Sequence, residues 1–252
     1  MIKIENLTKS FISKKGIKSD ALSEFSLEIK NDEFISIIGP NGCGKTTLLN
    51  IIAGFIEADS GFVKTENNLK IGYINQDYRA SLMPWFSVAG NITFPLGSIA
   101  RQERIKKLNE LIAVYETTSN QKFEIDLRKK PYELSGGQQQ LVNLLKTLII
   151  KPDLLLLDEA FSALDYEKRW GMLFLLQDLL SKFNIPTIFV SHDPDEAVFL
   201  ADKVVLMDNG KLKEIIENDL PKPRTYETIK TKKYVDYKEK VVSFISSFVN
   251  VS

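Results

Sequence analysis

Apolar and polar positions alternate at the start of the chain and give way to short, wholly apolar runs farther on. The alternation in Ile2–Leu7 predicts a strand, and Phe25–Ile38 is strand-like around a turn at Lys30–Glu33. The run Phe34–Ile38 precedes a glycine-rich loop, and Thr47–Ala53 then has the pattern of a helix. A strand, a loop and a helix in this order begin a parallel α/β unit.

The middle of the chain changes from strand-like to helical character. Gly61–Asn75 reads as strand and ends in Ile71–Ile74, whereas Asp77–Ile150 reads as mainly helical. Apolar residues recur there at helical spacing, with Arg and Lys between them. These residues are Ile105, Leu108, Leu111, Ile112 and Tyr115.

Strands and helices alternate again in the second half, followed by a hairpin signature at Asp208-Asn209-Gly210. From residue 221 the tail is rich in Lys and Tyr and ends in the weakly amphipathic Val241–Val249. The pattern therefore predicts an α/β core with a helical insertion. The expected elements are Leu154–Leu157, Tyr166–Lys182, Thr187–Ser191, Pro194–Ala201, Val204–Met207 and Lys211–Ile215.

Composition narrows the class of protein. The 252 residues carry 33 Lys and Arg against 33 Asp and Glu, so no global basic field favours nucleic acid as a partner. The single cysteine, Cys43, excludes an internal disulfide and fits a reducing compartment. No apolar run approaches the roughly 18–20 residues that span a bilayer, and the first residues lack the apolar stretch of a signal peptide. If the protein acts at a membrane, we therefore expect it to do so from the cytoplasmic side, through a partner.

The loop after Phe34–Ile38 carries a phosphate-binding motif, and its strand and helix distinguish it from a chance glycine-rich turn. Its glycines let backbone N–H groups turn inward, and the helix N-terminus adds positive potential. We expect Lys45 to reach the terminal phosphates of ATP and the Thr46 hydroxyl to ligate Mg²⁺. The expected nucleotide-binding residues here are Gly39, Pro40, Asn41, Gly42, Cys43, Gly44, Lys45, Thr46 and Thr47.

Two further features belong to the same chemistry. Cys43 has the alternatives of a reactive thiol and of a small loop residue beside the phosphates, and we favour the second. The apolar run Leu154–Leu157 ends in Asp158 and Glu159. In open parallel sheets ligands lie at the carboxyl ends of strands. Asp158 is thus placed to hold Mg²⁺ through its water shell, and Glu159 to polarise the attacking water.

A second anion-seeking feature follows the helical insertion. Ser135 and Gln138 form a capping box that opens a helix running toward Ile150. The box alone indicates only a well-capped helix, but with Gly136 and Gly137 it exposes N–H groups at a helix N-terminus. One chain then has two phosphate-seeking surfaces. A head-to-tail dimer uses both, with each Ser135 turn covering the ATP on the partner's Lys45 loop.

With these motifs the sequence strongly resembles the nucleotide-binding subunits of ABC transporters over residues 1–220. Gly39–Thr46 resembles their Walker A motif, Leu154–Glu159 their Walker B motif, and Leu134–Gln138 their signature motif. The resemblance implies an α/β fold: a P-loop NTPase core of mainly parallel sheet, with an N-terminal antiparallel β subdomain and an inserted α-helical subdomain. It also implies an ATPase that uses ATP and Mg²⁺ and couples hydrolysis to transport.

Further residues gain roles only through this resemblance. Gln76 matches the glutamine that contacts Mg²⁺ and the attacking water, and Asp165 lies in a segment like the loop that crosses the dimer interface. His192 matches the histidine that contacts the γ-phosphate. A lone histidine is usually solvated or structural, but its place after Thr187–Ser191 favours function. Phe11 is similar in position to the aromatic residue that stacks on adenine, although aromatics near strand ends are often core residues.

Two positions depart from the family pattern. Leu141 and Lys146 stand where relatives usually have Arg, and neither position is catalytic in the family. The segment Ser81–Val88 is unusually apolar for a loop. It either packs the helical insertion through Trp85 and Phe86 or forms a groove for a helix of a membrane subunit.

The Met-Pro-Trp pattern in this segment, with Asn91, is similar to importers of the nitrate, sulfonate and taurine group. The resemblance therefore implies a second copy of the chain, a transmembrane permease and a solute-binding protein as partners, at the inner face of the cell membrane. No nucleic-acid partner is expected. The alternative is a soluble ABC ATPase without a transport role, such as one that serves iron–sulfur cluster assembly.

The expected domain organisation is an ABC ATPase domain over residues 1–220, with the helical subdomain inserted at about residues 78–150. Residues 221–252 are expected to form a short helical tail. Its Lys and Arg excess predicts a solvated face. The basic residues are Lys222, Arg224, Lys230, Lys232, Lys233, Lys238 and Lys240, against Glu227, Asp236 and Glu239.

Overall fold

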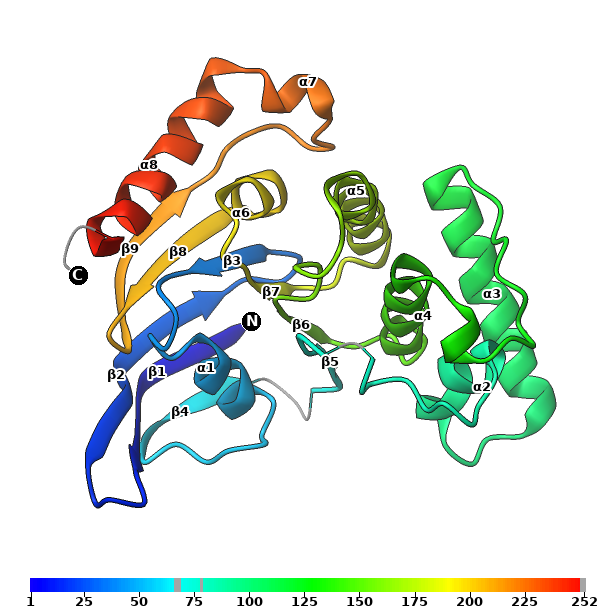
Figure 1. Ribbon diagram of the computed structural model, residues 1–252, viewed down its shortest axis with the longest axis horizontal. Coiled ribbons are helices and arrows are strands. Elements are labelled where there is room, and N and C mark those ends of the chain that lie inside the picture. The colour runs from blue at the N-terminus through cyan, green and yellow to red at the C-terminus, as the bar shows by residue number, and fades with distance from the viewer. Residues whose placement is uncertain (66–68, 78, 250–252) are drawn as a thin grey trace. The chain divides into compact units, whose positions relative to one another are not determined.

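A computed structural model describes residues 1–65, 69–77 and 79–249, and the chain divides into two compact units (Figure 1). Unit 1 combines Met1–Leu69 with Pro186–Ser252, and unit 2 is Lys70–Ile185. The boundaries expected at residues 78, 150 and 220 stay predictions. Residues 78 and 250–252 lie outside the described residues, as do residues 66–68 of the strand expected over Gly61–Asn75.

Unit 1 begins with a three-stranded antiparallel sheet of order β2-β1-β4. Strand β1 (Ile2–Ile12) pairs with β2 (Lys18–Ile29) and with β4 (Ser60–Thr65). Alternate side chains such as Ile4 and Leu27 are buried, as the alternation predicts. β1 extends beyond the predicted Ile2–Leu7, because its second half pairs with β2 in a hairpin whose side chains are largely exposed.

The other strands of unit 1 have the order β7-β3-β8-β9. β3 (Phe34–Ile38) is wholly buried and runs parallel to β7 (Thr187–Val190) and to β8 (Lys203–Asp208). β8 and the antiparallel β9 (Lys211–Glu217) form the predicted hairpin. The parallel pairing brings the carboxyl ends of β3 and β7 to one edge, where the phosphate loop and His192 begin.

Unit 1 has two helices between its strands, α1 (Lys45–Ile52) and α6 (Pro194–Leu200), and two in its C-terminal part, α7 (Tyr226–Ile229) and α8 (Lys232–Val249). α8 packs beside α6 and is longer than the predicted Val241–Val249 (Figure 1).

The prediction that the basic residues of the tail form a solvated face is wrong for Arg224. Its side chain is 1% exposed and donates hydrogen bonds to backbone carbonyls at the end of α6. A guanidinium can be buried in this way because its planar fork satisfies several acceptors at once. The position of those acceptors could not be read from the sequence.

Unit 2 is built on a parallel pair of strands, β5 (Ile71–Ile74) and β6 (Leu154–Asp158). Every residue of β6 is buried, as its unbroken apolar run predicts. α4 (Gly136–Leu148) packs on β5. The two elements are so close at Gly72 that a Cβ there would come within 2.7 Å of Thr147 Cγ2.

The remaining helices of unit 2 pack on one another and on α4. α3 packs on α2 and on α5, and α2 packs on α4. Within the described residues, no helix combines the length and apolar character needed to cross a bilayer. The elements are α2 (Val88–Thr93), η1 (Phe94–Leu96), α3 (Arg101–Ser119), η2 (Pro131–Glu133) and α5 (Tyr166–Phe183).

Candidate functional site

The phosphate motif of unit 1 forms the turn between β3 and α1. Lys45 is 6% exposed, and its Nζ donates hydrogen bonds to the carbonyls of Gly39 at 2.8 Å and Pro40 at 2.9 Å. The loop therefore holds an ammonium group within its own curve. Thr46, in the first turn of α1, is exposed, as are Asn41 and Gly42 at the top of the loop.

The start of α1 is suited to an anion. Gly44 occupies its N-cap with φ 104°, and no side chain caps this end of the helix. A Cβ there would lie 2.1 Å from the Ala21 carbonyl oxygen, so a larger residue could not keep this turn. The first N–H groups of a helix lack intrahelical acceptors. With Lys45 and the Thr46 hydroxyl beside them, they have the chemistry of a site for ATP phosphates and Mg²⁺.

Cys43 is buried in the same loop. Its carbonyl accepts a hydrogen bond from Gly210 N–H at 3.0 Å, which ties the loop to the turn between β8 and β9. Desolvation by burial raises the pKa of the thiol, against the lowering effect of Lys45. A buried thiol with a raised pKa is mostly protonated near neutral pH and therefore a poor nucleophile. The structure thus favours the interpretation of Cys43 as a small loop residue.

His192 lies at the same edge of unit 1 as the phosphate loop. It follows β7, and Ser191 N–H donates a hydrogen bond to the Ile37 carbonyl of β3 at 3.2 Å. The imidazole is exposed. Phe11 pairs across the hairpin with Ser19 and is 43% exposed rather than in the core, with Lys9 Nζ 5.7 Å from the centre of its ring. Unit 1 thus supplies a lysine, a histidine and an open aromatic ring.

Unit 2 brings together the acidic residues and the glutamine. Asp158 and Glu159 follow one another at the end of β6, and Gln76 follows β5, its parallel neighbour. Gln76 Nε2 donates a hydrogen bond to Glu159 Oε2 at 3.1 Å. Tyr73, which sequence reasoning missed, donates from its hydroxyl to Asp158 Oδ2 at 3.4 Å. Its place near the end of a predicted strand, three residues before Gln76, was the signal available in the sequence.

The signature turn has the predicted capping box. Ser135 Oγ accepts a hydrogen bond from Gln138 N–H, and Gln138 Oε1 accepts one from Ser135 N–H at 3.0 Å. Gln140, one turn along α4, donates from Nε2 to the Ala160 carbonyl at 2.8 Å. The helix that carries the signature is therefore bonded to the segment that follows Glu159.

Asp165 is the N-cap of α5. Its carboxylate accepts hydrogen bonds from the Lys168 backbone N–H at 3.0 Å and from Lys168 Nζ. The hydrogen bond from the Lys168 ammonium holds the pKa of Asp165 below its ordinary value. Within this chain Asp165 thus has a structural task, whatever it contacts in a dimer.

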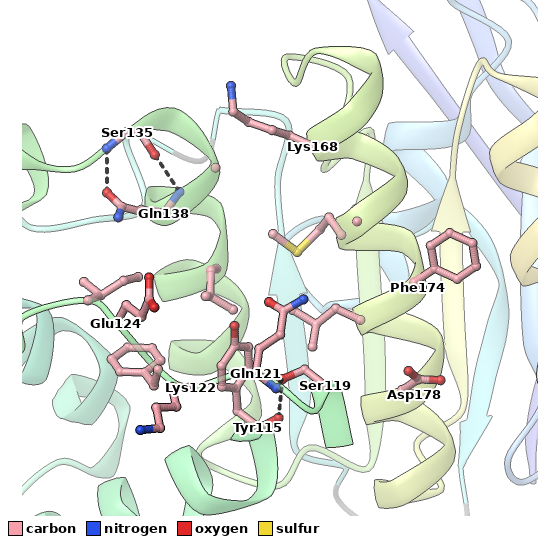
Figure 2. A pocket seen from close by; sticks show the side chains of 17 residues that line it. Tyr115, Ser119, Gln121, Lys122, Glu124, Ser135, Gln138, Lys168, Phe174 and Asp178 are labelled. Carbon is pink, nitrogen blue, oxygen red and sulfur yellow. Dashed lines mark hydrogen bonds between the residues drawn. The ribbon is translucent and has the colours of Figure 1, made fainter. Parts of the chain in front are cut away.

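A pocket of about 810 Å³ lies behind the signature turn, between α3, α4 and α5 (Figure 2). Ser135 and Gln138 are at one end of the lining, and Asp178 is on α5. Leu141 is among the lining residues. This departure from the expected Arg therefore falls in the wall of a pocket that neither Asp158 nor Glu159 lines.

The apolar segment after Gln76 is held by Asn91, a residue whose structural task the sequence did not show. Asn91 is fully buried, and its amide nitrogen donates to the carbonyls of Met83, Phe86 and Ser87 at 3.1–3.3 Å. Its Oδ1 accepts a hydrogen bond from Met83 N–H at 2.8 Å.

Lys146 supports the same segment from α4. Its Nζ donates to the Ser81 carbonyl at 2.5 Å and lies 5.8 Å from the centre of the Phe94 ring. Burial lowers the pKa of this ammonium. Lys146 therefore holds the Ser81 carbonyl from the position where the family resemblance led us to expect Arg.

Comparison with known proteins decides the family. A model of the ABC transporter family matches residues 22–162. The chain is also 36% identical to an ABC transporter ATP-binding protein of Methanocaldococcus jannaschii, over 98% of this chain and 92% of that protein. The chain belongs to the ABC transporter ATP-binding family.

Other relatives of this ABC ATPase are longer proteins. It is 34% identical to the bicarbonate transport ATP-binding protein CmpC of Synechocystis over 97% of this chain, and 36% identical to the nitrate import ATP-binding protein NrtC of Synechococcus elongatus over 89%. The chain spans only 38% and 35% of those two proteins.

Solved structures confirm the cassette fold. A dimeric bacterial ABC transporter cassette aligns with a TM-score of 0.73 at 28% identity, over 86% of this chain and 98% of that chain. The same cassette in a post-hydrolysis state with ADP and phosphate aligns with a TM-score of 0.72. The predicted fold class, ATPase activity and use of ATP and Mg²⁺ are thereby confirmed for this chain as a family member.

Proposed function

We propose that this chain powers solute import as one of two identical ATPase subunits, which close head-to-tail on two ATP molecules. The observation that carries the proposal is the Ser135 turn. It is exposed and capped within its own chain, and it presents glycine N–H groups at the start of a 13-residue helix. The dimeric cassette among the structural neighbours supports the arrangement.

The proposed division of labour follows the two units. In unit 1, Lys45 binds the terminal phosphates, Thr46 ligates Mg²⁺, and His192 contacts the γ-phosphate. The remaining loop residues and Thr47 bind phosphate through their backbone, and Phe11 stacks on adenine. In unit 2, Asp158 and Gln76 hold Mg²⁺ and its water, and Glu159 polarises the attacking water. The hydrogen bond between Gln76 and Glu159 supports a joint task for these two.

The signature turn and Asp165 are proposed to act in trans. Ser135, Gly136, Gly137 and Gln138 cover the ATP bound by the partner subunit, and Asp165 lies at the dimer interface. Because each ATP then contacts both subunits, binding of ATP stabilises the closed dimer and hydrolysis removes this stabilisation.

The proposed contact with a permease is the segment Ser81–Val88. Trp85 is 68% exposed, so it does not pack the core of the helical insertion. Phe86, half-buried, packs against Phe94. An exposed aromatic on a segment fixed by Asn91 is typical of a binding surface. We therefore favour a groove for a membrane-subunit helix, with the chain bound peripherally at the inner face of the cell membrane.

The proposed cargo belongs to the nitrate, sulfonate and taurine group, and a solute-binding protein completes the system. The relatives named for bicarbonate transport and nitrate import support this choice. Relatives named for spermidine and putrescine import, one of them 40% identical, define the competing cargo class.

Purification of the chain from its native membranes tests the proposal. Wild-type chain and the control Tyr132→Ala, which removes another exposed aromatic of unit 2, should both retain a permease. Trp85→Ala should lose it while keeping ATP binding. Recovery of no membrane protein with wild-type chain would contradict import and favour a soluble ATPase. Stimulation of ATPase activity by taurine, sulfonates or nitrate, but not by polyamines, would support the cargo group.

A further inference from the structure

The C-terminal tail of unit 1 contacts the short helix that follows His192. α6 begins at its N-cap Asp193, directly after this histidine, and has seven residues. A helix of this length is unstable by itself and depends on contacts at its ends. Both ends of α6 are bonded to residues of the tail.

The first contact is at the start of α6. Tyr234 of α8 is 1% exposed, and its hydroxyl lies 3.1 Å from both the carbonyl oxygen and Oδ1 of Asp195. Lys238, one turn farther along α8, pairs with Asp195 Oδ2 at 2.7 Å. Asp195 N–H in turn donates to Oδ1 of Asp193 at 2.8 Å. A short series of bonds therefore connects α8 to the residue beside His192.

The second contact is at the end of α6. Arg224 Nη1 donates to the carbonyls of Phe199 at 2.9 Å and Ala201 at 2.8 Å. The last carbonyls of a helix have no intrahelical donors, and a cation near them is favoured by the helix dipole. Asn218 adds a bond from Nδ2 to Ala201 O at 2.8 Å. The end of α6 is thus fixed by a buried charge from the tail.

The turn that carries His192 is bonded to α6 as well. Ser191 Oγ donates to Glu196 Oε2 inside α6 and accepts a hydrogen bond from Asp193 N–H at 3.0 Å. Residues on both sides of His192 therefore move with α6. A helix held at both ends gives the histidine one fixed position at the edge of the sheet.

We propose that the tail positions His192 for ATP hydrolysis by holding α6 through Tyr234, Lys238 and Arg224. The inference rests on the proposed role of His192 at the γ-phosphate. Loosening the tail leaves the phosphate loop intact, so it lowers kcat and leaves KM for ATP unchanged. A tail that only stabilised the fold would lower kcat by the same factor with or without His192.

The test uses the full chain and steady-state ATPase assays well below its melting temperature. Tyr234→Phe removes only the hydroxyl, and Lys238→Met removes the half-buried cation. Each should lower kcat about five- to tenfold, the value of one hydrogen bond that positions a residue. Tyr237→Phe is the matched control on the same helix, because its hydroxyl bonds Asp219 instead of α6. It should keep the wild-type kcat.

A double-mutant cycle separates this inference from the proposed function. Tyr234→Phe should have no further effect on the residual kcat of His192→Ala, because the residue that it positions is gone. Equal fold-losses in both backgrounds, or a wild-type kcat for both Tyr234→Phe and Lys238→Met, would overturn the inference alone. A wild-type kcat for His192→Ala would overturn the proposed role of His192 itself.

Discussion

Replacing Asn91 with alanine should release the apolar segment Ser81–Val88 while leaving the rest of unit 2 folded. The side chain is fully buried, its two amide N–H groups are shared among the carbonyls of Met83, Phe86 and Ser87, and Oδ1 accepts one hydrogen bond. Counted as three full hydrogen bonds, each contributing about 1 kcal/mol net of exchange with water, they contribute about 3 kcal/mol.

Hydrogen exchange measures this loss where it occurs. Each 1.4 kcal/mol is a factor of ten, so exchange of the Met83 amide should accelerate by about 100-fold in Asn91→Ala. Exchange in β6 should change little, because its residues are buried in the core of unit 2. Asn109→Ala, which truncates an exposed asparagine of α3, is the matched control and should leave Met83 protection unchanged.

Unchanged protection of the Met83 amide in Asn91→Ala would show that a contact other than Asn91 holds the segment. If protection falls as expected, binding of the permease should fall with it while ATP binding persists. If the variant loses protection but keeps full permease binding, the permease does not require an ordered Ser81–Val88 segment.

Three further predictions concern other parts of the chain. Because burial raises the pKa of Cys43, its alkylation should be slow at neutral pH and should accelerate as the pH rises toward that pKa. Alkylation should also abolish ATP binding, because Cys43 lies in the phosphate loop. Full ATPase activity after stoichiometric modification would contradict this placement. Gly171→Ala, in an open helical position, should raise the melting temperature by about 1–4 °C. Gly72→Ala should lower the melting temperature, because the added methyl group would overpack against α4. The opposite order of melting temperatures would contradict the packing described. Lys146→Met should remove about 1 kcal/mol of support from the Ser81 carbonyl, seen as faster exchange near that residue; no change would show that the ammonium does not hold it.

Much of the fold could be predicted because its signals are local. The wholly apolar run of β6 indicated a buried strand, and the Ser135 capping box indicated where α4 begins. The last hairpin could be predicted because Asn209 and Gly210 are residues that favour the positive φ such a turn requires, and both have positive φ in the structure.

The features that could not be predicted depend on groups far apart in the chain. Burial of Arg224 depends on carbonyls 23–26 residues earlier, and the bond between Gln76 and Glu159 spans 83 residues. The sequence paired Gln76 with the active site only through family resemblance. The contact between Tyr234 and Asp195 could not be predicted for the same reason, because no local sequence pattern indicates Asp195 as its partner.

The most direct test of the account is the mass of Glu159→Gln in solution with and without ATP and Mg²⁺. This change removes the group proposed to polarise water but leaves the phosphate loop and the Ser135 turn. We predict a monomer of 28.6 kDa without ATP and twice that mass with it, by light scattering, together with loss of ATP hydrolysis. Ser135→Arg in the same background should bind ATP and remain monomeric. A Glu159→Gln chain that hydrolyses ATP at the wild-type rate, or that binds ATP without forming a dimer, would contradict the account.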